Sequence, residues 1–288
     1  MAEIRTLKKL PAGLYIVATP IGNLGDITRR AKDTLAAADL VACEDTRITG
    51  KLLNAYLIKK PMLPYHEHNA AGQRPKILTK IAEGGVVVLV SDAGTPLISD
   101  PGYKLVDEAH KMGLMVTSLP GPSAVPTALS VAGLPTNRFL FMGFSPTKTK
   151  ARHDWFAAEK ETEATLVYYE SAKRLAASLR DAASALGPRP AAVCRELTKK
   201  FEQVVRNDLV SLAAHYEKAE TPKGEIVVVI GSAPKSEKRE GTSIYTDETL
   251  QLALNHMSVK SAAAFVAELT GEKRKGLYAR ALELSEKN

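Results

Sequence analysis

Short runs of apolar, β-branched residues alternate with amphipathic stretches through the first half of the chain. The strand-like runs cover residues 13–18, 40–42, 86–90 and 115–118. Several end in turns rich in Gly, Pro or Asp, namely TPIGNLGD, CEDTR, SDAGTP and LPGPSA. This alternation is typical of parallel βαβ units. We therefore predict an α/β domain over residues 1–134, with its ligand beyond the carboxyl ends of the strands, where these turns fall.

A second set of strand-like runs follows Pro135. These runs cover residues 139–143, 165–169, 191–194, 201–205 and 226–230. Helix-like segments lie between them at residues 172–186 and 208–219. The pattern predicts a second α/β domain over residues 135–231, which meets the first near Leu134.

The pattern changes again near residue 232. Residues 232–243, SAPKSEKREGTS, are polar and charged without apolar periodicity, as expected for a linker. Helical periodicity returns at residues 247–257, 261–269 and 275–284. We expect a small three-helix module over residues 244–288.

Composition narrows the class of protein. With 288 residues, 45% hydrophobic and 25% charged, the chain has an ordinary globular composition. Its longest apolar runs are far too short to cross a bilayer, and the N-terminus does not resemble a secretory signal. Only Cys43 and Cys194 occur, so neither a disulfide framework nor a cysteine zinc cluster is expected. A cytoplasmic protein fits these features.

The chain is basic, with 39 Lys and Arg against 32 Asp and Glu, a net charge of +7. This excess favours an anionic partner such as nucleic acid, although a generally basic surface explains the total equally well.

The turn TPIGNLGD follows the first predicted strand and opens a helix. Gly22 and Gly25 allow positive φ and a close approach of the backbone to a ligand. The glycine spacing matches neither GxGxxG nor a P-loop, and the phosphate-binding Lys is missing, which disfavours a phosphate cradle. A tight turn capped by Asp26 or Thr28 is an equally good explanation of this loop alone.

The loop SDAGTPLISDPG, Ser91 to Gly102, carries more chemistry. Asp100 is expected as a helix N-cap with Pro101 in the first turn. Capping does not explain Asp92 and Thr95, which suit contacts to a polar or cationic ligand. In PGPSA, Pro122 is expected to start a helix whose free N–H groups face the same sheet edge.

Seven motifs occur in one order: TPIGNLGD, CEDTR, YHEHN, SDAGTPLISDPG, LPGPSA, VYYES and CRELTKKFE. Together they resemble the ribosomal RNA small-subunit methyltransferase I group of the tetrapyrrole-methylase-like S-adenosylmethionine enzymes. The resemblance implies the two-domain α/β class III methyltransferase fold with a small C-terminal helical module. It also implies a homodimer that binds S-adenosylmethionine in the interdomain cleft. The implied reaction is 2′-O-methylation of a cytidine ribose in small-subunit (16S) rRNA, either free or in the assembled subunit.

The resemblance assigns cofactor contacts motif by motif. The expected residues are Pro20, Asp92, Ala93, Gly94, Thr95, Pro96, Ile98, Ser123, Ala124, Tyr169, Glu170, Gly224 and Glu225. The first loop departs from the GxGPGD pattern of the corrin and porphyrin methylases, which argues against a tetrapyrrole substrate.

A sulfonium methyl group is already electrophilic, so the protein must mainly hold the ribose hydroxyl in line with it. A proton acceptor within hydrogen-bond reach of the hydroxyl would help. The candidate catalytic residues are Glu44, Asp45 and Arg47 of CEDTR, and His66, Glu67, His68 and Asn69 of YHEHN. Asp45 could instead be a helix cap paired with Arg47. The two histidines could share a face as metal ligands, but the remaining histidines are scattered, so no metal is expected.

Basic residues gather in three places that could contact RNA phosphates. They are Lys148, Lys150 and Arg152, then Arg195, Lys199 and Lys200, and finally Lys273, Arg274 and Lys275. Phosphate contacts give affinity without sequence information. For each residue taken singly, a solvated surface charge is the simpler explanation.

Two other functions stay open at this stage. The protein could methylate a small anionic molecule such as a tetrapyrrole with the same cofactor. It could also be a non-catalytic RNA-binding assembly factor, in which case the glycine and proline loops only shape the fold.

Overall fold

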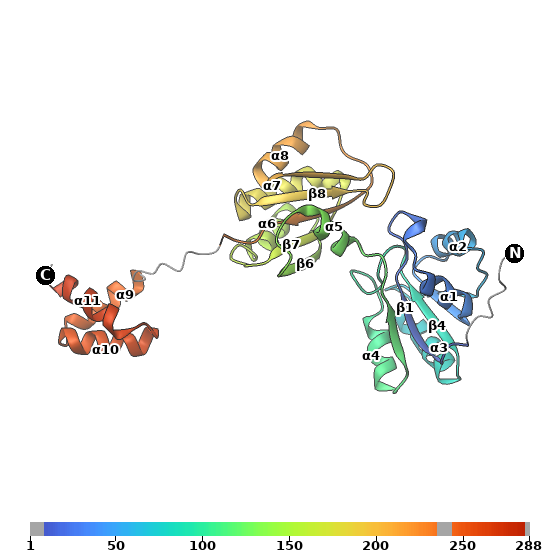
Figure 1. The fold of residues 1–288 in the computed structure, drawn as a ribbon, viewed down its shortest axis with the longest axis horizontal. Helices are drawn as coiled ribbons and strands as arrows, with labels where there is room; N and C mark the ends of the chain where they lie inside the picture. Colours follow the sequence, from blue (N-terminus) through green and yellow to red (C-terminus); the bar gives the residue numbers. More distant parts are fainter. Residues whose placement is uncertain (1–8, 235–243, 286–288) are drawn as a thin grey trace. The chain divides into compact units, whose positions relative to one another are not determined.

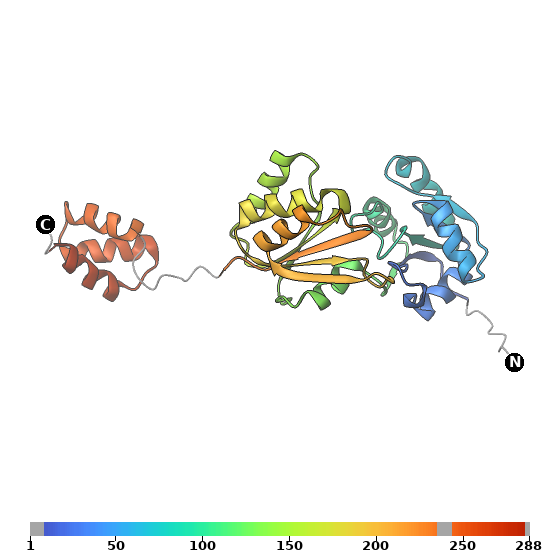
Figure 2. The ribbon, with the colours of Figure 1, turned by 90° about the horizontal axis from the view of Figure 1, so that it is seen from above.

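The computed structural model describes residues 9–234 and 244–285. The chain divides into two compact units, Met1–Ala233 and Pro234–Asn288. The first unit holds two β-sheets with their helices, and the second is a group of helices (Figures 1 and 2). The domain boundary expected at residue 134 falls inside the first unit and stays a prediction. No helix in the described ranges is long and apolar enough to cross a bilayer.

The first sheet is entirely parallel, as the sequence predicts. Its strands are β1 (Gly13–Val17), β2 (Leu40–Cys43), β3 (Met62–Pro64), β4 (Val86–Val90) and β5 (Val116–Leu119), in the order β3-β2-β4-β1-β5. The central strands β1 and β4 are buried along their whole length, which explains why both are continuous apolar runs. The sequence did not predict β3, because a three-residue strand ending in Pro64 has no alternating pattern.

Helices cover both faces of this sheet (Figure 1). They are α1 (Arg29–Ala37), α2 (Thr46–Ala55), α3 (Ala70–Ala82) and α4 (Tyr103–Lys111), with a short 3-10 turn η1 (Leu24–Asp26) before α1. Alternate residues of β1 point to opposite faces. Val17 therefore packs in one cluster with Leu35 of α1, and Ile16 packs in another with Leu105 of α4.

Two predicted helix starts are wrong and two predicted caps are confirmed. The helix α4 begins at Tyr103 behind Gly102, whose φ of +144° suits glycine, so Asp100 is not its N-cap. The helix α5 (Ala124–Ala132) begins after Ser123, two residues beyond Pro122. Thr28 caps α1, accepting from the N–H of Ala31, and Asp45 caps α2.

The second sheet is mixed. Its strands are β6 (Phe139–Phe144), β7 (Thr165–Ser171), β8 (Pro190–Arg195), β9 (Gln203–Asp208) and β10 (Glu225–Ile230), in the order β6-β7-β10-β8-β9. Only β6 and β7 are parallel, and the other three pairs are antiparallel. All five runs were predicted, but β9 starts two residues later than expected because residues 201–202 belong to the β8–β9 turn.

Each face of the second sheet has its own helices. The helices α6 (Thr149–Ala157), α7 (Leu175–Leu186, preceded by the 3-10 turn η2, Ala172–Arg174) and α8 (Leu209–Lys218) share one apolar cluster. On the other face, Val125 and Leu129 of α5 pack with Val229 of β10. Ile21, from the loop after β1, joins this second cluster, so that loop is anchored against the second sheet.

The second unit contains α9 (Ile244–Leu254), α10 (Val259–Thr270) and α11 (Arg274–Ser285). Leu250, Val266 and Leu277 form its own small core, one from each helix. The three helices are those that the periodicity predicts, with α9 beginning three residues earlier. Most of the predicted linker, residues 235–243, lies outside the described residues.

Candidate functional site

A cavity of about 550 Å³ opens in the first unit, where the turns after β1, β4 and β5 meet the second sheet. Its lining comes from both sheets. The residues are Ile21, Asp92 to Thr95, Ile98 to Asp100, Ser123, Ala124, Phe144, Tyr169 to Ala172, Arg174, Cys194, Leu197 and Gly224 to Val227. A volume between about 300 and 1,000 Å³ is typical of small-ligand sites.

The loop Ser91 to Gly102 is tied to the other two turns by hydrogen bonds. The N–H of Thr19 donates to the carbonyl of Gly94 at 2.8 Å, and the N–H of Gly94 donates back at 3.0 Å. The hydroxyl of Thr95 donates to the carbonyl of Pro122 at 3.0 Å. Gly94 has a φ of +79°, a conformation that glycine adopts without strain. Three motifs that are distant in sequence thus form one wall of the cavity.

The same loop carries backbone strain. Leu97 and Ser99 have φ values of +73° and +64°, in the left-handed region that residues with a Cβ rarely adopt. Such residues concentrate where the surrounding structure holds a loop in a functional shape. The carbonyl and side-chain directions along one side of the cavity are therefore set by tertiary contacts.

Acidic side chains gather at this wall. Burial, the largest cause, raises the pKa of Asp92 and of Asp100 above the usual carboxyl range. Burial also raises the pKa of Glu44, and the nearby charges of Asp92 and Asp100 raise it further. Glu44 does not line the cavity, but it lies beside two carboxylates that do.

Asp45 and Arg47, two other catalytic candidates, have structural partners. The Asp45 carboxylate accepts from the backbone N–H of Arg47 at 2.8 Å and forms an ion pair with its guanidinium at 2.6 Å. The side-chain hydrogen bond to Arg47 is the main reason that the pKa of Asp45 falls to about 2. A carboxylate this acidic is a poor proton acceptor at neutral pH.

The motif YHEHN forms the turn between β3 and α3. Asn69 accepts from the N–H of His66 at 2.9 Å and donates to the carbonyl of Pro64 at 3.0 Å, so it holds the turn in shape. The rings of His66 and His68 meet edge to face with centroids 6.1 Å apart. Neither histidine lines the cavity. Within the described ranges, no group of three or more potential metal ligands comes together.

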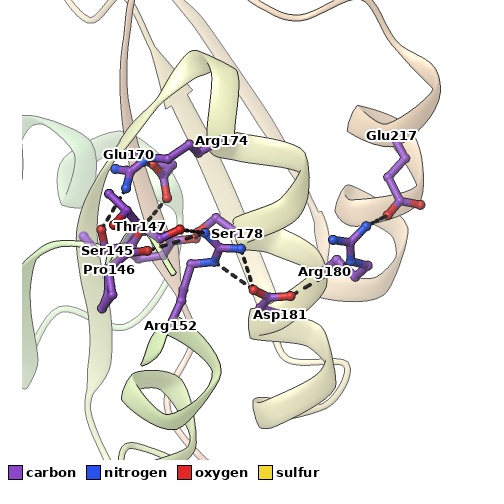
Figure 3. Close-up of polar contacts among 11 residues, drawn as sticks. Ser145, Pro146, Thr147, Arg152, Glu170, Arg174, Ser178, Arg180, Asp181 and Glu217 are labelled. Carbon is purple, nitrogen blue, oxygen red and sulfur yellow. Dashed lines mark hydrogen bonds and ion pairs between the residues drawn. The ribbon is translucent and has the colours of Figure 1, made fainter. Parts of the chain in front are cut away.

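Glu170 of β7 is the buried acid at the opposite wall. Its carboxylate pairs with Arg174 at 2.8 Å, accepts from the N–H of Ser171 at 2.7 Å and accepts from the hydroxyl of Ser145. Arg174 also donates to the carbonyl of Ser145 at 3.1 Å (Figure 3). Glu170 and Arg174 thus form a hydrogen-bonded ion pair with Ser145 and Ser171 at this wall.

Tyr169 is the main aromatic group of the cavity. Its ring lies 5.0 Å from that of Phe141 and 5.1 Å from that of Phe144, measured between centroids. Burial raises the pKa of its hydroxyl to about 12, so the hydroxyl stays protonated at neutral pH. The site therefore offers a ligand an aromatic ring, held edge to face and tilted against two others, together with a neutral hydroxyl.

Lys199 joins the loop after β8 to the loop after β1. Its ammonium pairs with Glu196 at 2.7 Å and with Glu225 at 3.0 Å. Its stem lies on Gly22, where an added Cβ would be 2.3 Å from Lys199 Cγ. Gly224 likewise has to be a glycine, because an added Cβ would lie 2.3 Å from the carboxylate of Glu196. The ammonium of Lys199 is thus neutralised by two carboxylates of the protein itself, which makes it a weaker candidate for a phosphate contact.

All but two of the predicted cofactor residues line the cavity. The exceptions, Pro20 and Pro96, are buried and adjoin lining residues in sequence. Phe144, Arg174 and Leu197 are among the lining residues that sequence reasoning missed. Arg174 follows Glu170 by four residues, a spacing at which an acidic and a basic side chain can form an ion pair, and this signal could have pointed to it. The other two are apolar and carry no signal of their own.

The predicted phosphate-binding residues differ in exposure. Lys148, Lys150 and Lys200 are exposed, as are Lys273, Arg274 and Lys275 in the second unit. Arg152 is not available to RNA, because its side chain is only 3% exposed and pairs with Asp181 at 2.6 Å (Figure 3). The interpretation of Arg152 as a phosphate contact is corrected accordingly.

Family comparison agrees with this geometry. Residues 13–213 match the family Tetrapyrrole (Corrin/Porphyrin) Methylases, and residues 242–285 match the RsmI C-terminal HTH domain. A Mesorhizobium japonicum protein named ribosomal RNA small subunit methyltransferase I is 49% identical, over 97% of this chain and 94% of the relative. This chain belongs to that family. Escherichia coli O157:H7 has a relative of the same name, 44% identical over 94% of each chain.

Solved structures share the fold of this family member. The cobalt precorrin-4 methyltransferase of cobalamin biosynthesis superposes with a TM-score of 0.56 at 20% identity, over 76% of this chain and 94% of the other. Uroporphyrin-III C-methyltransferase from Thermus thermophilus, complexed with S-adenosyl homocysteine, gives 0.51 at 18% identity, over 75% and 96%. The class III methyltransferase fold predicted from sequence is confirmed.

Proposed function

We propose that this protein transfers the methyl group of S-adenosylmethionine to the 2′-hydroxyl of a cytidine ribose in small-subunit rRNA. The observation that carries the proposal is its likeness, across almost the whole chain, to relatives named ribosomal RNA small subunit methyltransferase I. The cavity adds a site of the right size at the place where the sequence motifs converge.

The residues of the cavity fit the cofactor. Tyr169 offers an aromatic surface, and Gly94 lets a ligand approach the backbone closely. Asp92 and Asp100 supply negative charge, which favours a cationic ligand. When bound, S-adenosylmethionine supplies an electrophilic methyl group on a sulfonium centre. We assign its binding to the lining residues of the loop Ser91 to Gly102, with Ser123, Ala124, Tyr169, Glu170, Gly224 and Glu225.

Glu44 is the proton acceptor that the surroundings favour. Burial and neighbouring carboxylates raise its pKa, so its carboxylate is more basic than that of Asp45. A base whose pKa is nearer to neutrality takes a proton more effectively from a weakly acidic hydroxyl. The role of Glu44 is to hold the ribose hydroxyl and accept its proton, while Asp45 and Arg47 shape the start of α2.

We also propose that the protein acts as a cytoplasmic homodimer. The edge strand β6 exposes Phe139, Leu140 and Phe144, and an exposed apolar edge strand favours pairing with another chain. The exposed Lys148 and Lys150 follow this strand and suit contacts to RNA phosphates.

The decisive experiment uses small ribosomal subunits from cells that lack the protein. They are incubated with purified protein and labelled S-adenosylmethionine, and the label is mapped by nuclease digestion and mass spectrometry. The expected result is one methyl group on a cytidine ribose. Label on a base would contradict 2′-O transfer. In a parallel reaction with an added tetrapyrrole, label in the tetrapyrrole and none in rRNA would favour the small-molecule alternative.

A further inference from the structure

A second cavity, of about 440 Å³, lies beside the β8–β9 hairpin. The hairpin, the end of α8 and the segment after it form its lining. The lining residues are Arg195, Phe201, Gln203, His215, Tyr216, Ala219, Glu220, Thr221, Pro222 and Lys223. This groove is not part of the proposed cofactor site.

An exposed aromatic ring forms one side of the groove. Phe201 is 65% exposed at the tip of the hairpin, and the ammonium of Lys200 lies 5.6 Å from its ring centroid. An exposed Phe ring with a cation beside it contributes little to the core, but it offers a flat surface on which a nucleobase can stack.

Fixed basic groups lie behind this ring. The guanidinium of Arg195 donates to the side chain of Gln203 at 3.3 Å and to the carbonyl of Lys223 at 3.1 Å. Arg195 is therefore held in a fixed orientation by neutral acceptors. Its charge also acts on the nearby carboxylate of Glu196 and helps to lower the pKa of that group. Glu220 brings one negative charge to a lining that also contains Lys223.

The groove and the cofactor cavity share a wall. Cys194 and Gly224 line the cavity, whereas their chain neighbours Arg195 and Lys223 line the groove. Successive residues of a strand point to opposite faces, so β8 presents one cavity on each side. The groove and the cofactor cavity are therefore only one residue apart along the chain at two places.

We propose that this groove binds an unpaired nucleotide flanking the methylated one, with its base on Phe201 and its phosphate at Arg195 and Lys200. This inference rests on the proposed function, since it names a second contact of the same RNA substrate. Stacking accepts any base, so Phe201 positions the strand without selecting its sequence. The chemistry recognised is single-stranded RNA.

The test uses a short single-stranded RNA containing 2-aminopurine, whose fluorescence falls when the base stacks. The intact protein is expected to quench it. Phe201→Ala is expected to abolish the quenching, Phe201→Leu to do the same while keeping apolar volume, and Phe201→Trp to retain it. In methyl transfer to small subunits, Phe201→Ala should raise KM about tenfold with kcat little changed, the size expected for the loss of one stacked base.

Tyr103→Ala is the matched control. Tyr103 is 68% exposed and has Lys104 at 5.9 Å from its ring centroid, but it lines neither cavity. It should behave as the intact protein. Equal quenching by Phe201→Ala and the intact protein would overturn the proposal, as would dissociation of a dimer by Phe201→Ala. Quenching that depends on Phe201, in a protein that methylates no rRNA, would support the groove and refute the proposed reaction.

Discussion

The backbone N–H of Asp45 donates a hydrogen bond to Oδ1 of Asp92 at 3.1 Å, joining residues 47 positions apart. This bond ties the loop after β2 to the loop after β4. It brings Glu44, the residue before Asp45, close enough to Asp92 for the charge of Asp92 to raise the pKa of Glu44. The proposed proton acceptor thus depends on a carboxylate in the cofactor loop.

Replacing Glu44 with Gln should lower kcat for rRNA methylation by about 100-fold or more, because a general base typically contributes 10²–10⁴. Cofactor affinity, measured by calorimetry, should change little, since Glu44 does not line the cavity. Asp45→Asn is the control: Asn caps helices as well as Asp, so its kcat should stay within a few-fold of the intact protein. A normal kcat for Glu44→Gln would exclude it as the base.

Replacing Asp92 with Asn should move the acid limb of the kcat–pH profile to lower pH. The Asp92 charge raises the pKa of Glu44 by disfavouring its ionised form. Removing that charge lowers this pKa, so Glu44 stays ionised and active at a lower pH. Asp107→Asn, at an exposed residue paired with Lys111, is the control and should leave the profile unchanged. Coinciding profiles for all three proteins would refute the coupling.

Gly94→Ala should weaken cofactor binding as well as stability. At a φ of +79° an alanine is strained by about 1–3 kcal/mol, and its Cβ would lie 3.3 Å from Ile21 Cγ2. Gly84→Ala is the matched control, because Gly84 has a φ of +92° with no heavy atom within 4 Å of an added Cβ. Both variants should melt at lower temperature, but only Gly94→Ala should lose affinity in calorimetry. Equal loss of affinity in both would mean that the effect is general destabilisation.

Arg152→Ala should lower the free energy of unfolding by about 3–5 kcal/mol, since it removes the close partner of the buried Asp181 carboxylate and leaves it with the more distant Arg180, at 4.0 Å. Arg180 is the exposed arginine of the same network: it pairs with Glu217 at 3.2 Å and lies 4.0 Å from Asp181, so Arg180→Ala should cost only about 1 kcal/mol (Figure 3). The free energies of unfolding of the two variants and the intact protein are compared by urea denaturation. If Arg152→Ala unfolded like the intact protein and instead bound RNA more weakly, the original assignment to RNA would be restored.

The sequence alone determined the class of fold and the location of the proposed site. Buried parallel strands such as β1 and β4 are continuous apolar runs, and the turn that follows β4 carries Asp92, Gly94 and Asp100, which line the cavity. Both signals are local, because burial on two faces and turn geometry each constrain neighbouring residues directly. For this reason the predicted strands agree closely with the structure, and most of the residues proposed to bind the cofactor line one cavity.

Only the tertiary structure decided which polar residues are available for chemistry. Arg152 looked like a surface cation until Asp181, 29 residues away, was found beside it in the interior. Asp100 looked like a helix cap, but α4 starts beyond it and its carboxyl lies in the cavity lining. Glu44 and Asp45 are adjacent acids with opposite pKa shifts, set by burial and distant charges for one and by Arg47 for the other. Burial and partners distant in sequence decide whether such a side chain is structural or free to react, and the residues next to it in the sequence do not reveal either.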